Sequence, residues 1–200
     1  KFPAALVRDA GVAGAELEPV EYALLDPSAF SIAEARAALA PPFVAGGEFE
    51  TTLQGFDGTA RAYDIVWATH ALYAIPEAEI EAALVQFLAA LGRDGVGFIA
   101  HACEDAHYLR FHRDYLEDFR RGAGLAPYTS AEQLVSVLER LGAPVHTRDI
   151  TYHNGTGIEE RDRVEGYLQR CVFDDDVTLD ALESAPNTGA WLATCRNAQR

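Results

Sequence analysis

The central stretch of the chain combines a short apolar run with a helical stripe of apolar residues. Tyr63–Ala68 is an apolar run of strand length, and it stops where polar atoms appear at Thr69 and His70. After Pro76 the apolar residues recur at spacings that place them on one helix face: Ile80, Leu84, Phe87, Leu88 and Leu91. This stretch therefore predicts a strand followed by an amphipathic helix.

A second strand is predicted to follow that helix. Gly92–Gly95 is typical of a turn, and Val96–Ala100 is again a short buried-type run. A strand, a crossover helix and another strand make a βαβ unit of a parallel sheet. The polar residues after the first strand matter because open α/β sheets bind ligands at the carboxyl ends of their strands.

The amino-terminal third of the chain predicts a similar arrangement. Val20–Leu25 and Phe43–Thr52 are expected to hold strands, with a helix over Ser31–Leu39 between them. Ser31 and Glu34 have the spacing of a capping box, in which each side chain bonds a free N–H at the helix start.

After His101 the chain is predicted to be mainly helical. Ser130 and Gln133 have the spacing of a second capping box. The sequence contains no linker that would divide it, so we expect one α/β domain over residues 1–200 with a mostly parallel sheet. The remaining predicted elements are helices at Glu104–Arg121, Thr129–Leu141, Arg161–Val172 and Leu179–Ser184, and an alternating strand at Val145–His153.

Composition limits the classes of function. The 200 residues include 31 acidic and 16 basic side chains, a formal net charge of −15. That balance argues against nucleic-acid binding, which needs a basic face. No apolar run reaches the length of a membrane span, and Cys103, Cys171 and Cys195 form no CxxC pair. We therefore expect a cytoplasmic protein with reduced thiols and neither a membrane nor a nucleic-acid partner.

Two acidic residues follow predicted strands. Asp26 comes directly after Val20–Leu25, where a carboxylate offers acceptor oxygens to the vicinal hydroxyls of a ribose. The alternative is a turn aspartate that bonds its own backbone, since Pro27 favours a turn there. Glu48 lies at the end of the next predicted strand, where it is either an acceptor for an adenine amino group or an exposed edge acid.

A histidine and an aromatic helix face are further candidates. His70 at a strand end can act as a base or bind a ligand, although a lone histidine is more often a structural hydrogen-bond partner. His107, Tyr108, Phe111 and Tyr115 gather on one helix, where aromatic faces can attract a sulfonium or ammonium group. Core packing is the alternative for such a stripe.

The polar residues around His101 do not predict a metal site. His101, Cys103, Glu104, Asp105 and His107 are close in sequence, but their spacing fits neither HExxH nor a paired-cysteine pattern. The sequence also lacks a GxSxG elbow and a P-loop.

In order and spacing, these segments resemble the class I S-adenosylmethionine-dependent methyltransferases. The likeness spans about Val20 to Phe173 and depends on LLDPS, GGEFE, YDIVWATHALYAIP, LGRDGVGFIA and the aromatic helix. Within that superfamily the chain is similar to the histamine N-methyltransferase-like group, through THALYAIP, HYLRF, YTSAEQLVSVLERLGAPV and YLQRCVF. The resemblance implies a Rossmann-like, doubly wound sheet and methyl transfer from S-adenosylmethionine to a small molecule such as an amine.

The resemblance also assigns residues to that reaction. Those implied in cofactor binding are Asp26, Ser28, Glu48, Phe49, Thr69 and His70. Those implied in acceptor binding are Tyr73, His107, Tyr108 and Phe111. His70 is in addition the one candidate for a catalytic base.

The family's first strand and its glycine-rich loop have no counterpart in the chain. Lys1–Ala10 is typical of the end of the helix that follows that loop, and the family's last strand would be completed beyond Arg200. Because the first strand is central in the family's sheet, its absence would leave backbone groups unpaired. We expect either a piece of a longer methyltransferase or a chain that pairs with another, for instance as a homo-oligomer.

Two other functions stay open. A non-catalytic methyltransferase-like domain that binds a partner or small ligand is favoured if the chain is complete, because it lacks a glycine-rich loop. A nicotinamide-dependent oxidoreductase shares the acid after the second strand, but Lys1 is the only lysine, which argues against a catalytic Tyr–Lys pair.

Overall fold

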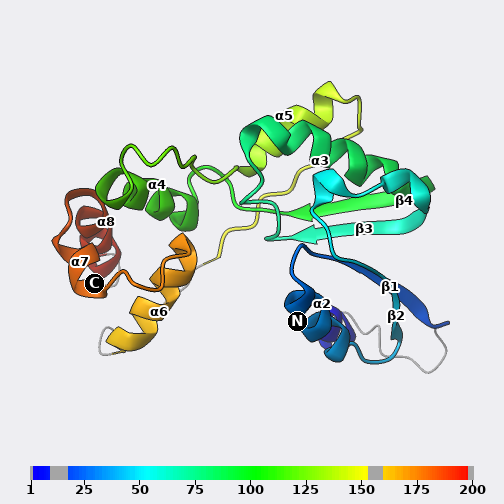
Figure 1. Cartoon of the computed structure of the whole chain (residues 1–200), viewed down its shortest axis with the longest axis horizontal. Helices are drawn as coiled ribbons and strands as arrows, with labels where there is room; N and C mark the ends of the chain where they lie inside the picture. The colour runs from blue at the N-terminus through cyan, green and yellow to red at the C-terminus, as the bar shows by residue number, and fades with distance from the viewer. Residues whose placement is uncertain (1, 10–17, 153–159, 198–200) are drawn as a thin grey trace. The chain divides into compact units, whose positions relative to one another are not determined.

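The computed structural model describes residues 2–9, 18–152 and 160–197 (Figure 1). The chain divides into two compact units. The first comprises Lys1–Val66 and Ala82–Gly97, and the second comprises Trp67–Glu81 and Phe98–Arg200. The single domain predicted from the sequence stays a prediction.

The first unit contains a helix followed by a βαβ arrangement. The elements that lie wholly within it are α1 (Phe2–Asp9), β1 (Val20–Leu25), α2 (Ala29–Ala37), β2 (Phe43–Phe49) and the 3₁₀ turns η1 (Leu53–Gly55) and η2 (Gly58–Ala60). β1 and β2 pair in parallel, with Val20 opposite Phe43 and Leu25 opposite Phe49. Both predicted strands are therefore confirmed, and β2 ends before Thr52.

α2 begins earlier than predicted, and Ser28 rather than Ser31 caps it. The Ser28 hydroxyl accepts the Ser31 N–H at 3.3 Å. The Ser28 N–H in turn donates to the Asp26 carboxylate at 2.8 Å. These two bonds fix a turn directly after β1, and the helix begins as soon as the turn is complete. The capping box predicted at Ser31 and Glu34 is therefore wrong.

A second βαβ motif is formed by β3 (Tyr63–Thr69), α3 (Glu77–Ala89) and β4 (Leu91–Ala100). The Tyr63 N–H donates to the Ala90 oxygen and the His70 N–H to the Ala100 oxygen, both at 2.9 Å. The two strands therefore run parallel, with their carboxyl ends side by side. α3 covers one face of the pair (Figure 1). The Phe87 ring of α3 lies against Gly97 of β4.

The turn predicted at Gly92–Gly95 is instead the first part of β4. A Cβ atom on Gly95 would lie 2.7 Å from the Tyr63 carbonyl oxygen, closer than real side chains approach. The missing side chain thus lets this segment lie against the start of β3. These glycines permit close pairing and do not end the strand.

Two separate two-stranded sheets, β1–β2 and β3–β4, account for the strands in the described part of the chain. With the helices that connect and follow them, they make a mixed α/β fold with short parallel pairs. The coarse fold class predicted from the sequence is therefore confirmed.

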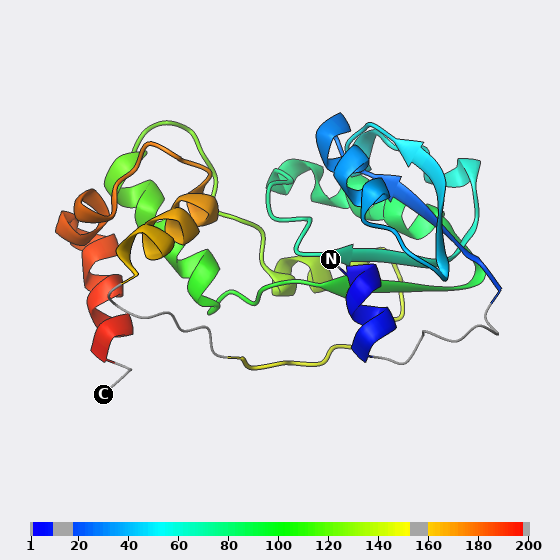
Figure 2. The same ribbon diagram turned by 90° about the horizontal axis from the view of Figure 1, so that it is seen from below.

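The second unit is mainly helical. α4, α6, α7 and α8 pack together in it (Figure 2). Its helices beyond β4 are α4 (His107–Phe119), α5 (Ala131–Arg140), α6 (Arg161–Val172), α7 (Leu179–Ser184) and α8 (Pro186–Asn197). α8 was not predicted, and α4 begins three residues later than expected. The capping box at Ser130 and Gln133 is confirmed, with the Ser130 N–H donating to the Gln133 side chain at 2.8 Å.

The strand predicted at Val145–His153 is wrong over residues 145–152, which form neither helix nor strand. His153 lies outside the described residues. Ile150 and Tyr152 are 76% and 59% exposed. Alternating polarity is not sufficient for a strand, because strand backbone also needs a neighbour for its N–H and C=O groups.

The core of the second unit lies among the packed helices. Tyr115, Leu168 and Leu182 are each no more than 2% exposed there. The Tyr115 hydroxyl and the Arg120 guanidinium both donate to the Asp174 carboxylate. These contacts fix α4 against the end of α6.

Candidate functional site

The carboxyl end of β3 carries a group of closely packed rings, all within the second unit. We call His70, Tyr73, His101, Tyr108 and Tyr128 the strand-end aromatic group. His70, the residue after β3, has a backbone φ of +50°, a left-handed conformation that costs a residue with a side chain about 1 kcal/mol or more. Its Nδ1 atom is hydrogen-bonded to the Tyr73 hydroxyl. Backbone strain of this kind gathers at functional sites.

Tyr73 lies at the centre of this group. Its ring centroid is 4.2 Å from that of His101, 5.0 Å from Tyr108 and 5.8 Å from Tyr128. Tyr108 and Tyr128 are stacked in turn, with centroids 5.3 Å apart and planes 19° apart. The arrangement brings together aromatic faces from three separate parts of the chain.

Thr129, which is 4% exposed, holds the group in place. Its N–H donates to the Tyr73 carbonyl oxygen at 3.4 Å, and its hydroxyl donates to the Ile75 carbonyl oxygen at 3.3 Å. The Thr129 oxygen accepts from His101 Nε2 at 2.9 Å. The loop after β3, the end of β4 and the segment before α5 are thereby joined.

Tyr73, His101 and Tyr128 are half-buried, and all three are uncharged at neutral pH. Burial raises the pKa of the Tyr73 and Tyr128 hydroxyls far above the ordinary value for tyrosine. Burial also lowers the pKa of His101, more than its bond to Thr129 raises it. The faces of neutral aromatic rings attract positive charge.

The other residues predicted in this unit have structural contacts. The Thr69 hydroxyl accepts a hydrogen bond from the indole N–H of Trp67. His107 Nε2 lies 2.6 Å from the Tyr167 hydroxyl. Phe111 is 1% exposed and packs against Trp191, with ring centroids 4.9 Å apart. Phe111 therefore belongs to the helical core, where a small-molecule acceptor would not reach it.

In the first unit, Asp26 and Ser28 form the turn after β1. One Asp26 oxygen accepts the Ser28 N–H, and no described residue bonds the other. The turn interpretation of Asp26 is thus correct for one oxygen, while the second keeps its capacity to accept a bond from a ligand hydroxyl.

Glu48 and Phe49 lie at the end of β2. The Glu48 carboxylate forms an ion pair with Arg36 at 3.1 Å. The Phe49 ring packs on Phe56, with centroids 4.9 Å apart. A cavity of about 230 Å³ adjoins Glu48, and it is lined by Ala29, Ile32, Ala33, Arg36, Glu48 and Glu50.

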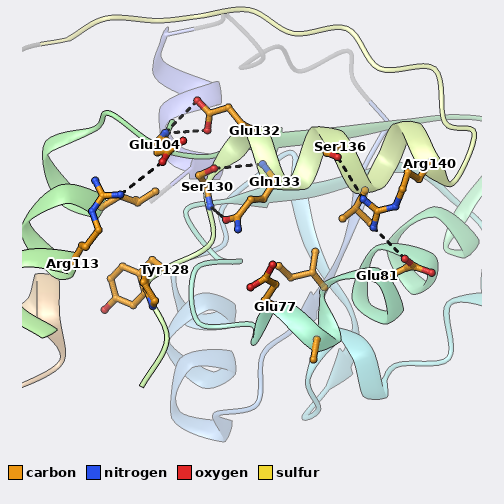
Figure 3. A pocket seen from close by; sticks show the side chains of 15 residues that line it. Glu77, Glu81, Glu104, Arg113, Tyr128, Ser130, Glu132, Gln133, Ser136 and Arg140 are labelled. Carbon is orange, nitrogen blue, oxygen red and sulfur yellow. Dashed lines mark hydrogen bonds and ion pairs between the residues drawn. The ribbon is translucent and has the colours of Figure 1, made fainter. Parts of the chain in front are cut away.

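A larger cavity, of about 610 Å³, lies in the second unit between α5, α4 and the start of α3 (Figure 3). Its charged lining residues are Glu77, Glu81, Glu104, Arg113, Glu132 and Arg140. Tyr128 lines this cavity and belongs to the strand-end aromatic group as well. We call this space the α5 cavity.

Sequence reasoning missed Tyr128, and it considered His101 only as a metal ligand. Tyr128 belongs to no periodic stripe, since it precedes α5. Its one local signal is the capping box at Ser130, which fixes where the preceding residues enter the helix.

Comparison of the chain with models of known protein families, with curated proteins and with solved structures found no match. Within the described ranges, no helix is both long and apolar enough to cross a membrane. The same residues contain no cluster of three or more His, Cys, Asp or Glu side chains that could hold a metal ion.

Proposed function

We propose that this chain binds S-adenosylmethionine and a small-molecule acceptor as part of a methyltransferase with Rossmann-like strand order. The observation that carries the proposal is the strand-end aromatic group. A left-handed His70 directly after a parallel strand places its ring on Tyr73, among neutral aromatic faces. Carboxyl ends of parallel strands are where open α/β sheets bind ligands.

The strand pairing supports the Rossmann-like order. In the sheet that the resemblance implies, the first strand is central. The strands on its two sides make separate parallel pairs, and the chain has the two pairs β1–β2 and β3–β4. A helix connects the two strands of each pair, α2 in the first and α3 in the second, as in a doubly wound sheet.

The residues of the first unit support a nucleoside contact unequally. Asp26 suits a ribose hydroxyl, because one of its carboxylate oxygens is unused. Glu48 would have to divide its oxygens between Arg36 and an adenine amino group. Asp26 is therefore the stronger of the two cofactor contacts.

When bound, S-adenosylmethionine supplies a methyl group on a positively charged sulfur, which the lone pair of an acceptor can attack. The neutral rings of Tyr73, Tyr108 and Tyr128 would stabilise positive charge by about 0.5–2 kcal/mol at each contact. The His70 imidazole, oriented by its bond to the Tyr73 hydroxyl, would take a proton from an amine acceptor.

Calorimetric titration tests the proposal with two ligands that differ in charge at sulfur. S-adenosylmethionine and S-adenosylhomocysteine should both bind the chain, and Tyr73→Leu should weaken the sulfonium compound more, by about threefold to tenfold. Phe30→Leu is the control, because Phe30 is 75% exposed and far from the group in sequence. If neither ligand gives heat or a thermal shift, the chain does not hold the cofactor.

A further inference from the structure

We propose that Phe173, the residue directly after α6, determines specificity at the strand-end aromatic group, where its ring is an apolar wall for the acceptor. Two described residues other than glycine have a positive backbone φ, His70 at +50° and Phe173 at +51°. The His70 ring is bonded to Tyr73. The Phe173 ring meets the Tyr128 ring edge to face, with centroids 6.2 Å apart and planes 76° apart. Both strained residues therefore carry rings that contact the same group, and this role of Phe173 rests on the acceptor binding proposed above.

The end of α6 does not require a phenylalanine at this position. Glycine or asparagine is usual where a helix ends in the left-handed conformation, and a bulky residue is a rare exception there. The Phe173 N–H donates to the Gln169 carbonyl oxygen, a backbone bond that glycine would also make. The Phe173 side chain is 74% exposed, so its ring gains little from burial in the chain itself. Neither capping nor core packing therefore explains the ring.

Hydrogen bonds on the turn after α6 hold Phe173 in its strained conformation. The Asp174 N–H also donates to the Gln169 carbonyl oxygen, at 3.2 Å, and the Asp174 carboxylate is bound by the two donors from α4. The Gln169 side chain donates to the carbonyl oxygens of Asp175 and Val177 at 3.0 and 2.9 Å. Strained residues persist where the surrounding bonds fix them in this way, and such residues gather at ligand sites. The turn thus keeps the Phe173 ring beside Tyr128 and exposed.

The surroundings of Phe173 favour an amine that carries an aromatic ring. The Tyr128 hydroxyl donates to the Cys171 carbonyl oxygen at 3.1 Å, which fixes the Tyr128 ring relative to the end of α6. Neutral rings such as Tyr73 and Tyr128 attract an ammonium group. The exposed Phe173 ring beside them can pack on an aromatic ring of the same ligand. An acceptor with both parts would use the two kinds of contact together.

Isothermal titration with benzylamine and methylamine tests this role, because the two share an ammonium group and differ by a phenyl ring. We expect benzylamine to bind about tenfold more tightly, since its ring can pack on Phe173. Phe173→Gly should reduce that preference to about twofold. The same change should raise the melting temperature, because glycine adopts this φ without strain. Phe173→Asn, which also tolerates the left-handed conformation, should behave in the same way.

Phe30→Gly is the matched control, since Phe30 is 75% exposed but lies in the helix α2. It should lower the melting temperature and leave the preference for benzylamine unchanged. The role of Phe173 would be overturned if neither amine gave heat, or if folded Phe173→Gly kept the full preference. A lower melting temperature with both amines weakened equally would mark Phe173 as structural and would overturn it too. S-adenosylhomocysteine, titrated in parallel, separates the two proposals: if it fails to bind while the amines behave as expected, methyl transfer is wrong and the role of Phe173 in amine binding is supported.

Discussion

The imidazole ring of His112 stacks face to face on the ring of Tyr128, with centroids 3.4 Å apart and planes 5° apart. His112 lies on α4 and is 6% exposed, and its Nδ1 atom has no hydrogen-bond partner in the described part of the chain. Burial lowers its pKa to about 4, so the ring is neutral at pH 7. The contact joins α4 to the segment before α5 through an uncharged pair.

The pKa of His112 predicts a loss of stability in mild acid. The unfolded chain takes up the proton near pH 6.5, whereas the folded chain takes it up only near pH 4. Because the unfolded state binds more protons between these values, the free energy of unfolding should fall across that window, by at most about 3 kcal/mol. His112→Phe keeps a stacked ring without the proton and should show a shallower loss in thermal unfolding from pH 7 to pH 4. His146→Phe, at an exposed position, should behave as the unmodified chain does.

The Asp118 carboxylate joins α4 to the start of α8 and should be important for stability. It accepts the N–H groups of Asn187 and Thr188 at 3.1 and 2.8 Å, and the side chains of the same two residues at 2.7 and 3.0 Å. Asp118→Ala would leave the two backbone N–H groups and the Asn187 amide without this acceptor, while the Thr188 hydroxyl keeps its bond to the Leu182 carbonyl oxygen. We expect a loss of about 2–3 kcal/mol in urea unfolding. Glu117→Ala removes only an exposed ion pair with Arg121 and should cost less than about 1 kcal/mol. Similar losses in the two variants would contradict the role of Asp118.

Gly58 should not tolerate a side chain. A Cβ atom there would collide with the Gln86 carbonyl oxygen and lie 3.0 Å from the Ala90 nitrogen. Gly58→Ala should therefore destabilise the chain by about 1–3 kcal/mol. Gly166→Ala is the contrasting control, because its Cβ would meet only the Arg170 side chain at 3.5 Å and alanine favours a helix by about 0.5–1 kcal/mol. Circular dichroism melts should shift in opposite directions, and a shift in one common direction would disprove the account.

Asp26→Asn should separate the two roles of that carboxyl group. The amide oxygen can still accept the Ser28 N–H, so the turn and the melting temperature should be kept. The negative charge is lost, and we expect S-adenosylhomocysteine to bind about tenfold more weakly. Asp64→Asn, an exposed change on β3, is the control. Unchanged affinity in calorimetry would exclude Asp26 as the ribose contact.

Local signals in the sequence were enough to predict most elements. The apolar run Val20–Leu25 forms β1 over the same residues, and the spacing of Ser130 and Gln133 gave the start of α5. Where two local signals competed, the sequence was ambiguous. Ser28 and Ser31 are both good cap residues, and the Asp26 bond that selects Ser28 was not apparent from spacing.

Contacts between distant parts of the chain were not predictable from local patterns. Asp118 meets Asn187 across 69 residues, and Tyr128 reaches Tyr73 although neither belongs to a shared stripe. The same limit explains the error at Val145–His153, since pairing depends on a neighbouring strand and not on alternation. The aromatic residues of α4 show that one stripe can serve both a site and the core. Tyr108 packs on Tyr73 of the candidate site, while Phe111 lies in the helical core.

The two tryptophans of the chain lie in different surroundings, so their fluorescence can report on two different regions of the molecule. Trp67 is 37% exposed on β3 and lies beside Phe98, with centroids 4.6 Å apart, whereas Trp191 packs on the buried Phe111 within the helices. Emission from Trp67 therefore follows the end of the parallel pair, and emission from Trp191 follows the helical core. Replacing either tryptophan by phenylalanine would let the fluorescence of the other follow the opening of its own region.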